Sequence, residues 1–442
     1  MKAAFHTLGC KVNSYESQAV LEQFISKGFE IVDFSESADV YIINTCSVTA
    51  MAEHKSRQML HRVKKLNPKA IVVAAGCYAQ RVGEELLKDD AIDIVVGNNK
   101  KSEIVDIIMD FMSDRSACTG AAQVDDLMRC TSYESQNISR LGDNVRAYVK
   151  IQDGCNRFCS YCIIPYVRGR SRCRSREEIL QEIRTLAANG YKEIVLTGID
   201  ISMYDGMIDL IEEIERVDGI ERIRLGSLEA GVITDEFIER FARCSKACPH
   251  FHLSLQSGCN ATLRRMNRHY SAEEFAGKVE HIRRSFPICA ITTDVIVGFA
   301  GETEEEFRES FEFVERMAFT QTHVFKYSRR EGTAADKMSG QVPEQVKNER
   351  SSLMIEMTDR LSREFEESLI GRVRPVLIEE ECRAVDGRRL LIGFTPEYVK
   401  AGIVIPEGCE GDAARERLIN QIMDVKIEDI ADTENGRVMI GN

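Results

Sequence analysis

The stretch that decides the fold is GCNRFCSYC, residues 154–162, which places Cys155, Cys159 and Cys162 within eight residues. Iron–sulfur clusters are held by cysteine thiolates at short, fixed spacings. Four protein ligands would saturate a [4Fe–4S] cluster, whereas three leave one iron open for another ligand. The spacing CxxxCxxC therefore favours a cluster with an open iron. Chance clustering of cysteines, or a zinc site that lacks its fourth ligand, is the alternative.

Around this stretch, residues from about 145 to 370 alternate between predicted strands and helices. The predicted strands are 146–152, 193–198, 222–227, 250–255, 290–298 and 322–328. The helices carry S/T-x-x-E capping boxes at Ser175 with Glu178, Ser271 with Glu274, and Thr303 with Glu306. Six βα units predict an open, partial (β/α)6 barrel, closed by helices at about 343–370. In such barrels the active site lies on the loops after the strands, where the three cysteines fall.

The first hundred residues have a βαβ rhythm that predicts a parallel, doubly wound sheet. Its strands at 3–9, 39–45 and 70–76 are followed directly by Cys10, Cys46 and Cys77. Ligands of open α/β sheets bind at the carboxyl ends of the strands, so the three thiols could converge on a second cluster. The alternative is that each is a small buried residue, as free cysteines often are. The strand order decides between them, and spacing alone does not give it.

The remaining segments complete a three-domain organisation. We predict an N-terminal domain at 1–112, a linker at 113–143, the second βα domain at 144–370 and a C-terminal domain at 371–442. The last contains short strand-like runs at 372–381, 388–395, 403–408, 421–430 and 436–442, without strong helices. Such runs predict a small β-barrel.

Composition excludes some classes of protein. The 442 residues carry a formal net charge of −13, so no global basic field indicates a nucleic-acid partner. No apolar run approaches the ~20 residues that span a bilayer, and the N-terminus lacks a secretory signal. The fifteen cysteines are an odd number and favour thiols or metal ligands over a disulfide framework. We therefore expect a soluble, cytoplasmic protein with no membrane partner.

These features resemble a known family. CxxxCxxC on that loop is the signature of the radical S-adenosylmethionine (SAM) superfamily, in which the open iron binds SAM. TLGCKVNSYES (7–17), NTCSVT (44–49) and AGCYAQR (75–81) resemble the signature segments of its methylthiotransferase family. The resemblance implies a flavodoxin-like N-terminal domain, a partial radical-SAM barrel and a C-terminal TRAM β-barrel. It also implies two [4Fe–4S] clusters, whose metal ligands are Cys10, Cys46, Cys77, Cys155, Cys159 and Cys162.

The resemblance extends to cofactor-binding positions along the barrel. They are Tyr161, Gly198, Ser227, Glu229, Gln256, Arg268 and Ile296. For each of them, sheet packing or turn formation is the competing interpretation. Three positions depart from the usual family pattern, because Ala230, Ala300 and Lys326 stand where the family often has proline. These departures touch the rigidity of turns and not the ligands.

Local charge indicates an RNA substrate. Residues 145–176 contain eight basic side chains against one acid. We expect the RNA-binding residues to include Arg168, Arg170, Arg172 and Arg174. A solvated surface is the plainer explanation of such a run. The C-terminal segment is acidic, with 10 Lys and Arg against 14 Asp and Glu, which weakens the case for RNA binding there.

The GCKVN around Cys10 resembles the branch that acts on N6-threonylcarbamoyladenosine at position 37 of tRNA. This implies radical sulfur insertion and methyl transfer using two SAM molecules, a tRNA anticodon loop as partner, no DNA, and an electron donor such as flavodoxin or ferredoxin. Two alternatives are methylthiolation of isopentenyladenosine-37 or of a ribosomal-protein aspartate. A third, of another class, is a non-catalytic iron–sulfur RNA-binding protein.

Overall fold

The computed structural model describes residues 1–113, 121–140, 145–405 and 417–442. Its N-terminal part is a parallel sheet in the order β2-β1-β3-β4-β5-β6. The strands are β1 (Lys2–Thr7), β2 (Glu30–Val32), β3 (Val40–Thr45), β4 (Ile71–Gly76), β5 (Ile94–Val96) and β6 (Ala121–Gln123). The helices are α1 (Lys11–Ser26), α2 (Ala50–Leu66), α3 (Cys77–Val82) and α4 (Ile104–Ser113). The order 2-1-3-4-5 is that of flavodoxin-like folds, so this prediction is confirmed.

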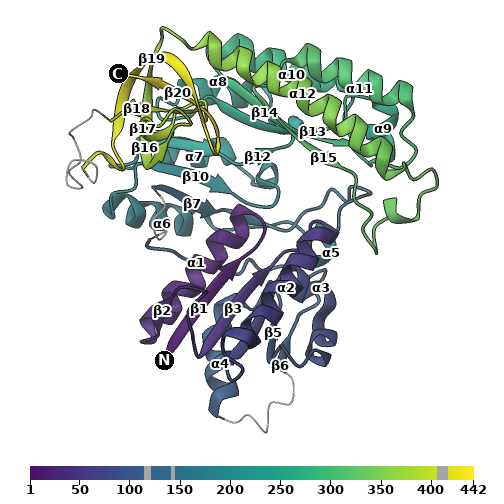
Figure 1. Cartoon of the computed structure of the whole chain (residues 1–442), viewed down its shortest axis with the longest axis vertical. Coiled ribbons are helices and arrows are strands. Elements are labelled where there is room, and N and C mark those ends of the chain that lie inside the picture. The colour runs from purple at the N-terminus through teal and green to yellow at the C-terminus, as the bar shows by residue number, and fades with distance from the viewer. Residues whose placement is uncertain (114–120, 141–144, 406–416) are drawn as a thin grey trace.

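Both faces of this sheet are covered, which explains why β3 and β4 are uninterrupted apolar runs. Every residue of these two central strands is buried. One face packs under α1 and α4, and the other under α2 and α3 (Figure 1). Strand β6 lies inside the predicted linker and forms the edge of the sheet beside β5. The sequence predicts only a linker with short structure here, because three residues are too few to show a strand pattern.

The middle part of the chain is the predicted partial barrel. Its parallel strands form two sheets, β11-β10-β7 and β12-β13-β14-β15. The bounds are β7 (Arg146–Lys150), β10 (Glu193–Thr197), β11 (Arg222–Leu225), β12 (Ser227–Leu228), β13 (His250–Gln256), β14 (Ala290–Val297) and β15 (Gln321–Lys326). The predicted strand 222–227 is divided at Gly226, so that β11 pairs with β10 and β12 pairs with β13. The two sheets are therefore joined along one strand.

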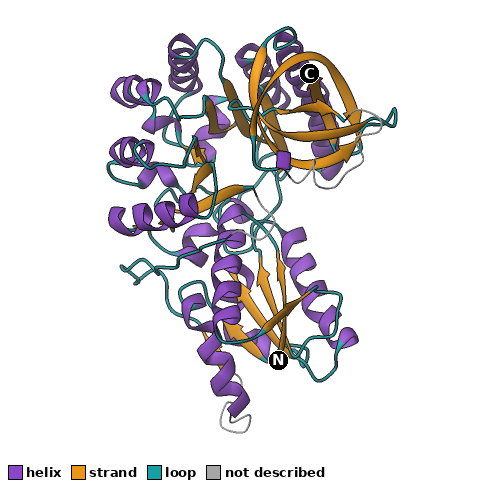
Figure 2. Ribbon diagram, turned by 90° about the vertical axis from the view of Figure 1, so that its left-hand side faces the viewer, coloured by secondary structure: helices purple, strands orange, loops and turns teal. Residues whose placement is uncertain are grey.

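Helices cover the outside of this barrel, as Figure 2 shows on its left-hand side. They are α6 (Arg176–Ala188), α7 (Met207–Glu215), α8 (Asp235–Arg243), α10 (Ala272–Ser285) and α11 (Glu304–Met317), with α9 (Asn260–Arg265) after β13. Both halves of the capping box form at Ser271 and Thr303. At Ser175 the side chain accepts from the Glu178 N–H, at 3.3 Å. Helix α12 (Glu344–Ser368) runs beside β15, where Lys326 contacts Glu344.

The C-terminal part is a closed five-stranded barrel in the order β16-β17-β18-β20-β19. Its strands are β16 (Val373–Arg383), β17 (Arg389–Phe394), β18 (Lys400–Val404), β19 (Ile422–Thr433) and β20 (Gly436–Gly441). The predicted β-barrel is confirmed, while its assignment as a TRAM module stays a prediction. The predicted strand 403–408 overlaps only the end of β18, and from residue 406 it lies outside the described residues.

Buried arginines dock this barrel onto the partial barrel. Arg222 donates to the backbone carbonyls of Phe394 and Pro375, at 2.8 and 2.6 Å. Arg224 donates to the carbonyls of Pro396 and Thr395, at 2.9 and 3.1 Å. Both arginines thus recognise main-chain carbonyls of the C-terminal barrel, and Arg224 also lies over the Tyr398 ring.

Candidate active site

Cys155, Cys159 and Cys162 form what we call the radical-type triad. They lie on a loop whose position is fixed by the surrounding backbone. β8 (Gln152–Asp153) pairs with β9 (Arg172–Cys173), so the chain returns on itself after the cysteines. The Cys155 N–H donates to the Gly169 carbonyl, at 3.0 Å. Gly154 has φ +73°, and a Cβ there would lie 2.0 Å from the Arg170 carbonyl oxygen. Only glycine fits this close approach, so Gly154 sets the entry of the loop.

Burial disfavours the thiolate forms of Cys155 and Cys162 until a cation binds them. Burial raises the pKa of Cys155 to about 12, and the neighbouring Cys159 acts in the same direction. Burial and then Cys159 raise the pKa of Cys162 to about 12 as well. A bound metal deprotonates a coordinating thiol outright. The three thiols therefore suit a strongly cationic centre and not a free nucleophile.

The auxiliary triad, Cys10, Cys46 and Cys77, converges because its strands are neighbours. β1, β3 and β4 lie side by side in the sheet, and one cysteine follows each. A Cβ built on Gly9 would lie 3.0 Å from the Cys46 Sγ. Burial raises the pKa of Cys46, and the thiols of Cys77 and Cys10 add to this effect. The structure thus brings together three thiols whose strand order the sequence left open.

The sulfur atoms of each triad lie further apart than a single tetrahedral ion requires. A tetrahedral zinc with bonds of about 2.3 Å holds its sulfur ligands about 3.8 Å apart. Among the described residues, only His252, Asp294 and His323 bring three candidate ligand atoms within 4.8 Å of one another. Neither cysteine triad is that tight. Cysteine thiolates are the usual ligands of iron–sulfur clusters, so the donor set of each triad suits the group that the sequence implies.

Several predicted cofactor-binding residues surround the radical-type triad. Arg268 lies between Glu229, at 2.7 Å, and the Cys159 Sγ, at 3.3 Å. The Tyr161 ring meets Phe299 edge-on, with centroids 6.2 Å apart, and Ile296 packs in the same apolar cluster. Charged and apolar side chains are thus both present around this triad.

The other predicted cofactor positions have local backbone reasons. Gln256 has φ +70°, at an irregularity where β13 meets β14. A Cβ on Gly198 would lie 2.9 Å from the Gln152 carbonyl oxygen. Ser227 is exposed and faces the interior of the barrel, beside a pocket described below. Their contacts with SAM stay predictions.

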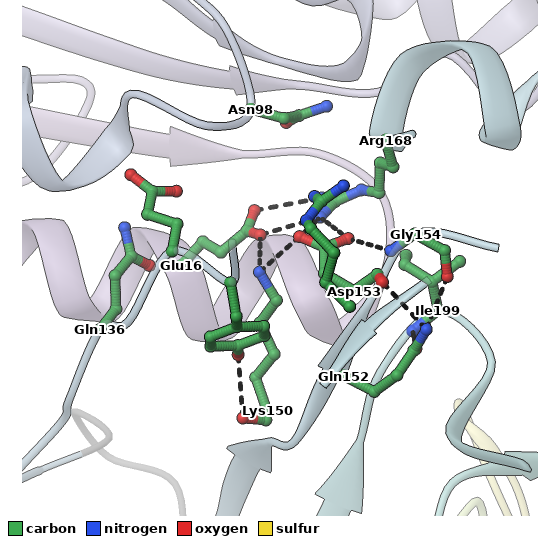
Figure 3. A network of polar contacts seen from close by, with 12 residues as sticks. Glu16, Asn98, Gln136, Lys150, Gln152, Asp153, Gly154, Arg168 and Ile199 are labelled. Carbon is green, nitrogen blue, oxygen red and sulfur yellow. Dashed lines mark hydrogen bonds and ion pairs between the residues drawn. The ribbon is translucent and has the colours of Figure 1, made fainter. Parts of the chain in front are cut away.

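A buried ionic network joins the two triads, and Figure 3 shows its central members. Arg168, from α5 (Ile164–Arg168), contacts Glu16 of α1 at 2.8 Å and Asp153 at 3.1 Å. Lys150 contacts both acids at 2.7 Å, and Lys101 pairs with Glu16. Burial opposes ionisation of Glu16, but Arg168, Lys101 and Lys150 hold its pKa well below the usual range.

The network has one more cation than it has carboxylates, and one of its cations, Arg168, lies beside Cys77. Its cations are Lys101, Lys150 and Arg168, and its carboxylates are Glu16 and Asp153. The Arg168 Nε lies 3.4 Å from the Cys77 Sγ. The loop after Cys162 also reaches this cysteine, because Ile163 and Val167 pack against Cys77. The negative charge of a metal-bound thiolate at Cys77 would balance this surplus positive charge. The network was missed from the sequence, because its members lie far apart in the chain and have no common spacing.

The structure corrects the predicted RNA-binding set. Arg168 is fully buried in the ionic network. Arg172 is buried and donates to the Arg170 carbonyl, while buried Arg174 pairs with Glu182. Arg170 remains exposed, with its guanidinium 4.6 Å from the Phe158 ring centre. Three of the four charges are therefore buried in contacts within the protein and are not presented to a phosphate backbone.

Comparison with known proteins agrees with this architecture. Residues 149–314 match the radical SAM superfamily, and residues 2–97 match "Uncharacterized protein family UPF0004". A radical SAM methyltransferase from Kitasatospora setae, TsrM, has the same fold over 76% of this chain and 77% of its own, with a TM-score of 0.58 and 17% identity. The fold and the CxxxCxxC loop define a radical SAM enzyme, with SAM and an iron–sulfur cluster as its cofactors.

Close relatives narrow this class. The threonylcarbamoyladenosine tRNA methylthiotransferase MtaB of Bacillus subtilis is 41% identical over 96% of this chain and 93% of its own. Its counterpart from Aquifex aeolicus is 40% identical over 87% and 94%. A tRNA-2-methylthio-N(6)-dimethylallyladenosine synthase from Acetivibrio thermocellus is 35% identical over 86% and 81%. The chain therefore belongs to the radical SAM methylthiotransferase family. No helix among its described residues is long and apolar enough to cross a membrane.

Proposed function

We propose that the protein converts N6-threonylcarbamoyladenosine at position 37 of tRNA to its 2-methylthio derivative, using two [4Fe–4S] clusters and two SAM molecules. One observation carries the two-cluster part of this proposal. The loop that leaves Cys162 packs directly on Cys77, through Ile163 and Val167. This packing holds the two triads near each other, which supports a reaction in which one centre activates a carbon and the other delivers sulfur.

The residues of the chain prepare this region for radical chemistry. When bound, SAM and the clusters supply hydrogen abstraction from an aromatic carbon, a sulfur atom and a methyl group. Glu229 and Arg268 would orient the charged end of SAM beside Cys159, and Tyr161 with Ile296 would pack against its adenine. Arg168 would hold Cys77 in place. The buried network and the apolar contacts around Cys77 exclude water, which protects reactive intermediates.

An exposed aromatic group supports an RNA loop as substrate. Tyr166 is 52% exposed, and its ring meets Phe158 edge-on at 5.8 Å. Arg170 covers the other ring of this pair. Unpaired bases stack on such aromatic and guanidinium surfaces. We infer that these three residues receive the anticodon loop near the radical-type triad.

The substrate base is assigned from similarity. Relatives named for threonylcarbamoyladenosine reach 41% and 40% identity, against 35% for one named for dimethylallyladenosine. The GCKVN around Cys10 points to the same branch. We also infer a cytoplasmic location, where tRNA is modified, and a small electron donor such as flavodoxin or ferredoxin.

Mass spectrometry of tRNA nucleosides tests this function. A strain that lacks the gene should lose 2-methylthio-N6-threonylcarbamoyladenosine and accumulate the unthiolated nucleoside, and the gene should restore the product. The level of 2-methylthio-isopentenyladenosine should not change. Loss of that second nucleoside alone would move the enzyme to the other branch, and no change in either would overturn the proposal.

A further inference from the structure

A pocket of about 260 Å³ lies where the three parts of the chain meet. Its wall includes Lys11 from the N-terminal part, Ser227, His252, Asp294 and His323 from the partial barrel, and Tyr398 from the C-terminal barrel. We call it the lumen pocket. It takes no part in holding either cysteine triad, and no role for it has yet been given.

Strand alternation explains why polar groups face this space. On β13, Phe251 and Leu253 pack outward into the helix-covered core, so His252 between them faces inward. Asp294 pairs in register with His323 on the neighbouring strand. Asp294 also precedes Ile296 by two residues and shares its face. The lumen pocket is thus about 7 Å along the strand from the predicted SAM position.

One end of the lumen pocket is cationic. Lys11, Arg146 and Arg224 all lie within 6 Å of the Tyr398 ring centre. Arg146 is paired with Glu379 at 2.6 Å, and Arg224 with Glu193 at 2.7 Å. Within the described part of the chain, no carboxylate lies within ion-pair distance of Lys11. Lys11 is therefore the cation at this end that has its charge available for a ligand.

The other end of the lumen pocket accepts hydrogen bonds. Asp294 lies 3.2 Å from the His252 Nε2, and the His252 Nδ1 lies 2.9 Å from the Thr292 hydroxyl. This holds the Asp294 carboxylate toward the space while leaving it lone pairs for another donor. The pocket therefore suits a ligand with a negative group at one end and a hydroxyl or N–H donor at the other.

The proposed substrate has this pattern. A threonylcarbamoyl group carries an α-carboxylate, a hydroxyl and urea N–H groups, whereas a dimethylallyl group carries neither charge nor donor. We propose that Lys11 binds the threonyl carboxylate and that Asp294, oriented by His252, accepts the hydroxyl. The inference rests on the proposed function. It makes Lys11, the residue after a thiol of the auxiliary triad, a specificity-determining residue.

The test compares two anticodon stem-loops, one with threonylcarbamoyladenosine at position 37 and one with its carboxyl methyl ester, which removes the charge. With reconstituted Lys11→Gln, kcat/KM for the free carboxylate should fall by about 10- to 100-fold. For the ester it should change less than about 3-fold. Lys11→Arg should recover most of the loss. Lys27→Gln, which changes an exposed lysine beyond the other end of α1, is the matched control.

Three readouts separate the outcomes. Iron content and 5′-deoxyadenosine formation should equal those of wild type in Lys11→Gln. Equal losses on both stem-loops would overturn the role of Lys11. A wild-type enzyme that thiolates neither stem-loop, yet cleaves SAM, would instead overturn the proposed function.

Asp294→Asn provides a second variant, remote from the cysteines. It should lose the preference of wild type for the threonyl substrate over an analogue made with glycine, which keeps the carboxylate and lacks the hydroxyl. An unchanged preference would contradict the role of Asp294. Metal analysis gives a second outcome that would contradict it. If the protein held one equivalent of a divalent ion other than iron, and His323→Ala lost that ion, then His252, Asp294 and His323 would be metal ligands.

Discussion

The two cysteine triads are built in opposite ways. The radical-type triad comes from one nine-residue loop, whereas the auxiliary triad is drawn from the ends of three strands spread over residues 10–77. The first is predicted from its spacing, its position after a strand and the surrounding βα pattern, and all three of its ligands share one local backbone. The second depends on β1, β3 and β4 being neighbours, which is a property of the whole sheet. The radical-type triad should therefore be lost through changes in its own loop. The auxiliary triad should also be lost when the sheet of the N-terminal part unfolds.

The largest effect is expected from removing the local triad. The combined change of Cys155, Cys159 and Cys162 to alanine should abolish both SAM cleavage and methylthiolation, since no protein ligand would remain for that cluster. Iron should fall from about eight to about four per chain, because the auxiliary cluster survives. Iron analysis and 5′-deoxyadenosine assays measure this, with Cys173→Ala, an exposed cysteine after the same loop, as control. Loss of all iron would show that the two sites assemble together.

Removing one ligand of the auxiliary triad should separate the two activities. Cys46→Ala should retain SAM cleavage and lose the 2-methylthio product, because the sulfur-carrying cluster would lack one of its three thiolates. Iron should again fall by about half. Formation of 5′-deoxyadenosine and of the thiolated nucleoside, measured in the same reaction, distinguishes these effects. Continued methylthiolation would contradict the assigned role of Cys46.

The buried ionic network that joins the two triads should contribute mainly to the stability of the fold. Arg168→Met keeps much of the side-chain volume but leaves Glu16 and Asp153 without their shared guanidinium. Breaking a buried ion pair in this way should lower the free energy of unfolding by about 3–5 kcal/mol. Denaturant unfolding of the reconstituted protein measures this, against Arg184→Met on the exposed side of α6. A loss of less than about 1 kcal/mol would argue against a structural role.

The smallest effect is expected at the neighbouring surface arginine. Arg170→Ala should weaken tRNA binding by a few-fold and reduce the dependence of affinity on salt by about one phosphate contact. The free energy of unfolding should stay within about 0.5 kcal/mol of wild type, because Arg170 is exposed. Binding titrations at several salt concentrations measure it. An unchanged affinity for tRNA together with a large loss of stability would show that Arg170 has a structural role and does not contact tRNA.

The sequence predicted the fold well because its signals were periodic and long. Buried runs gave the central strands, and capping residues such as Ser271 and Thr303 gave the helix starts. Short or interrupted elements were not predicted. Examples are β6 and the break at Gly226. A strand pattern needs several residues to repeat, and a change of sheet partner leaves the pattern unaltered.

The site was predicted less evenly. The six cysteines are predicted as cluster ligands because their position after strands has a chemical meaning, and this assignment stays a prediction. The basic run near residue 170 was misread, since charge density in a sequence does not show which cations meet carboxylates from another domain. Glu16, for example, lies 152 residues from its partner Arg168. The distinction between Arg168 and Arg170 is thus a property of tertiary structure alone.

The docking of the C-terminal barrel has an evolutionary consequence. Arg222 and Arg224 recognise main-chain carbonyls at Phe394, Thr395 and Pro396, which any residue of the same turn would present. These donors therefore specify the shape of the turn and not the side chains at the three positions. At Phe394 and Tyr398, however, the rings themselves lie against Arg146, so evolutionary drift in this turn should spare those two residues.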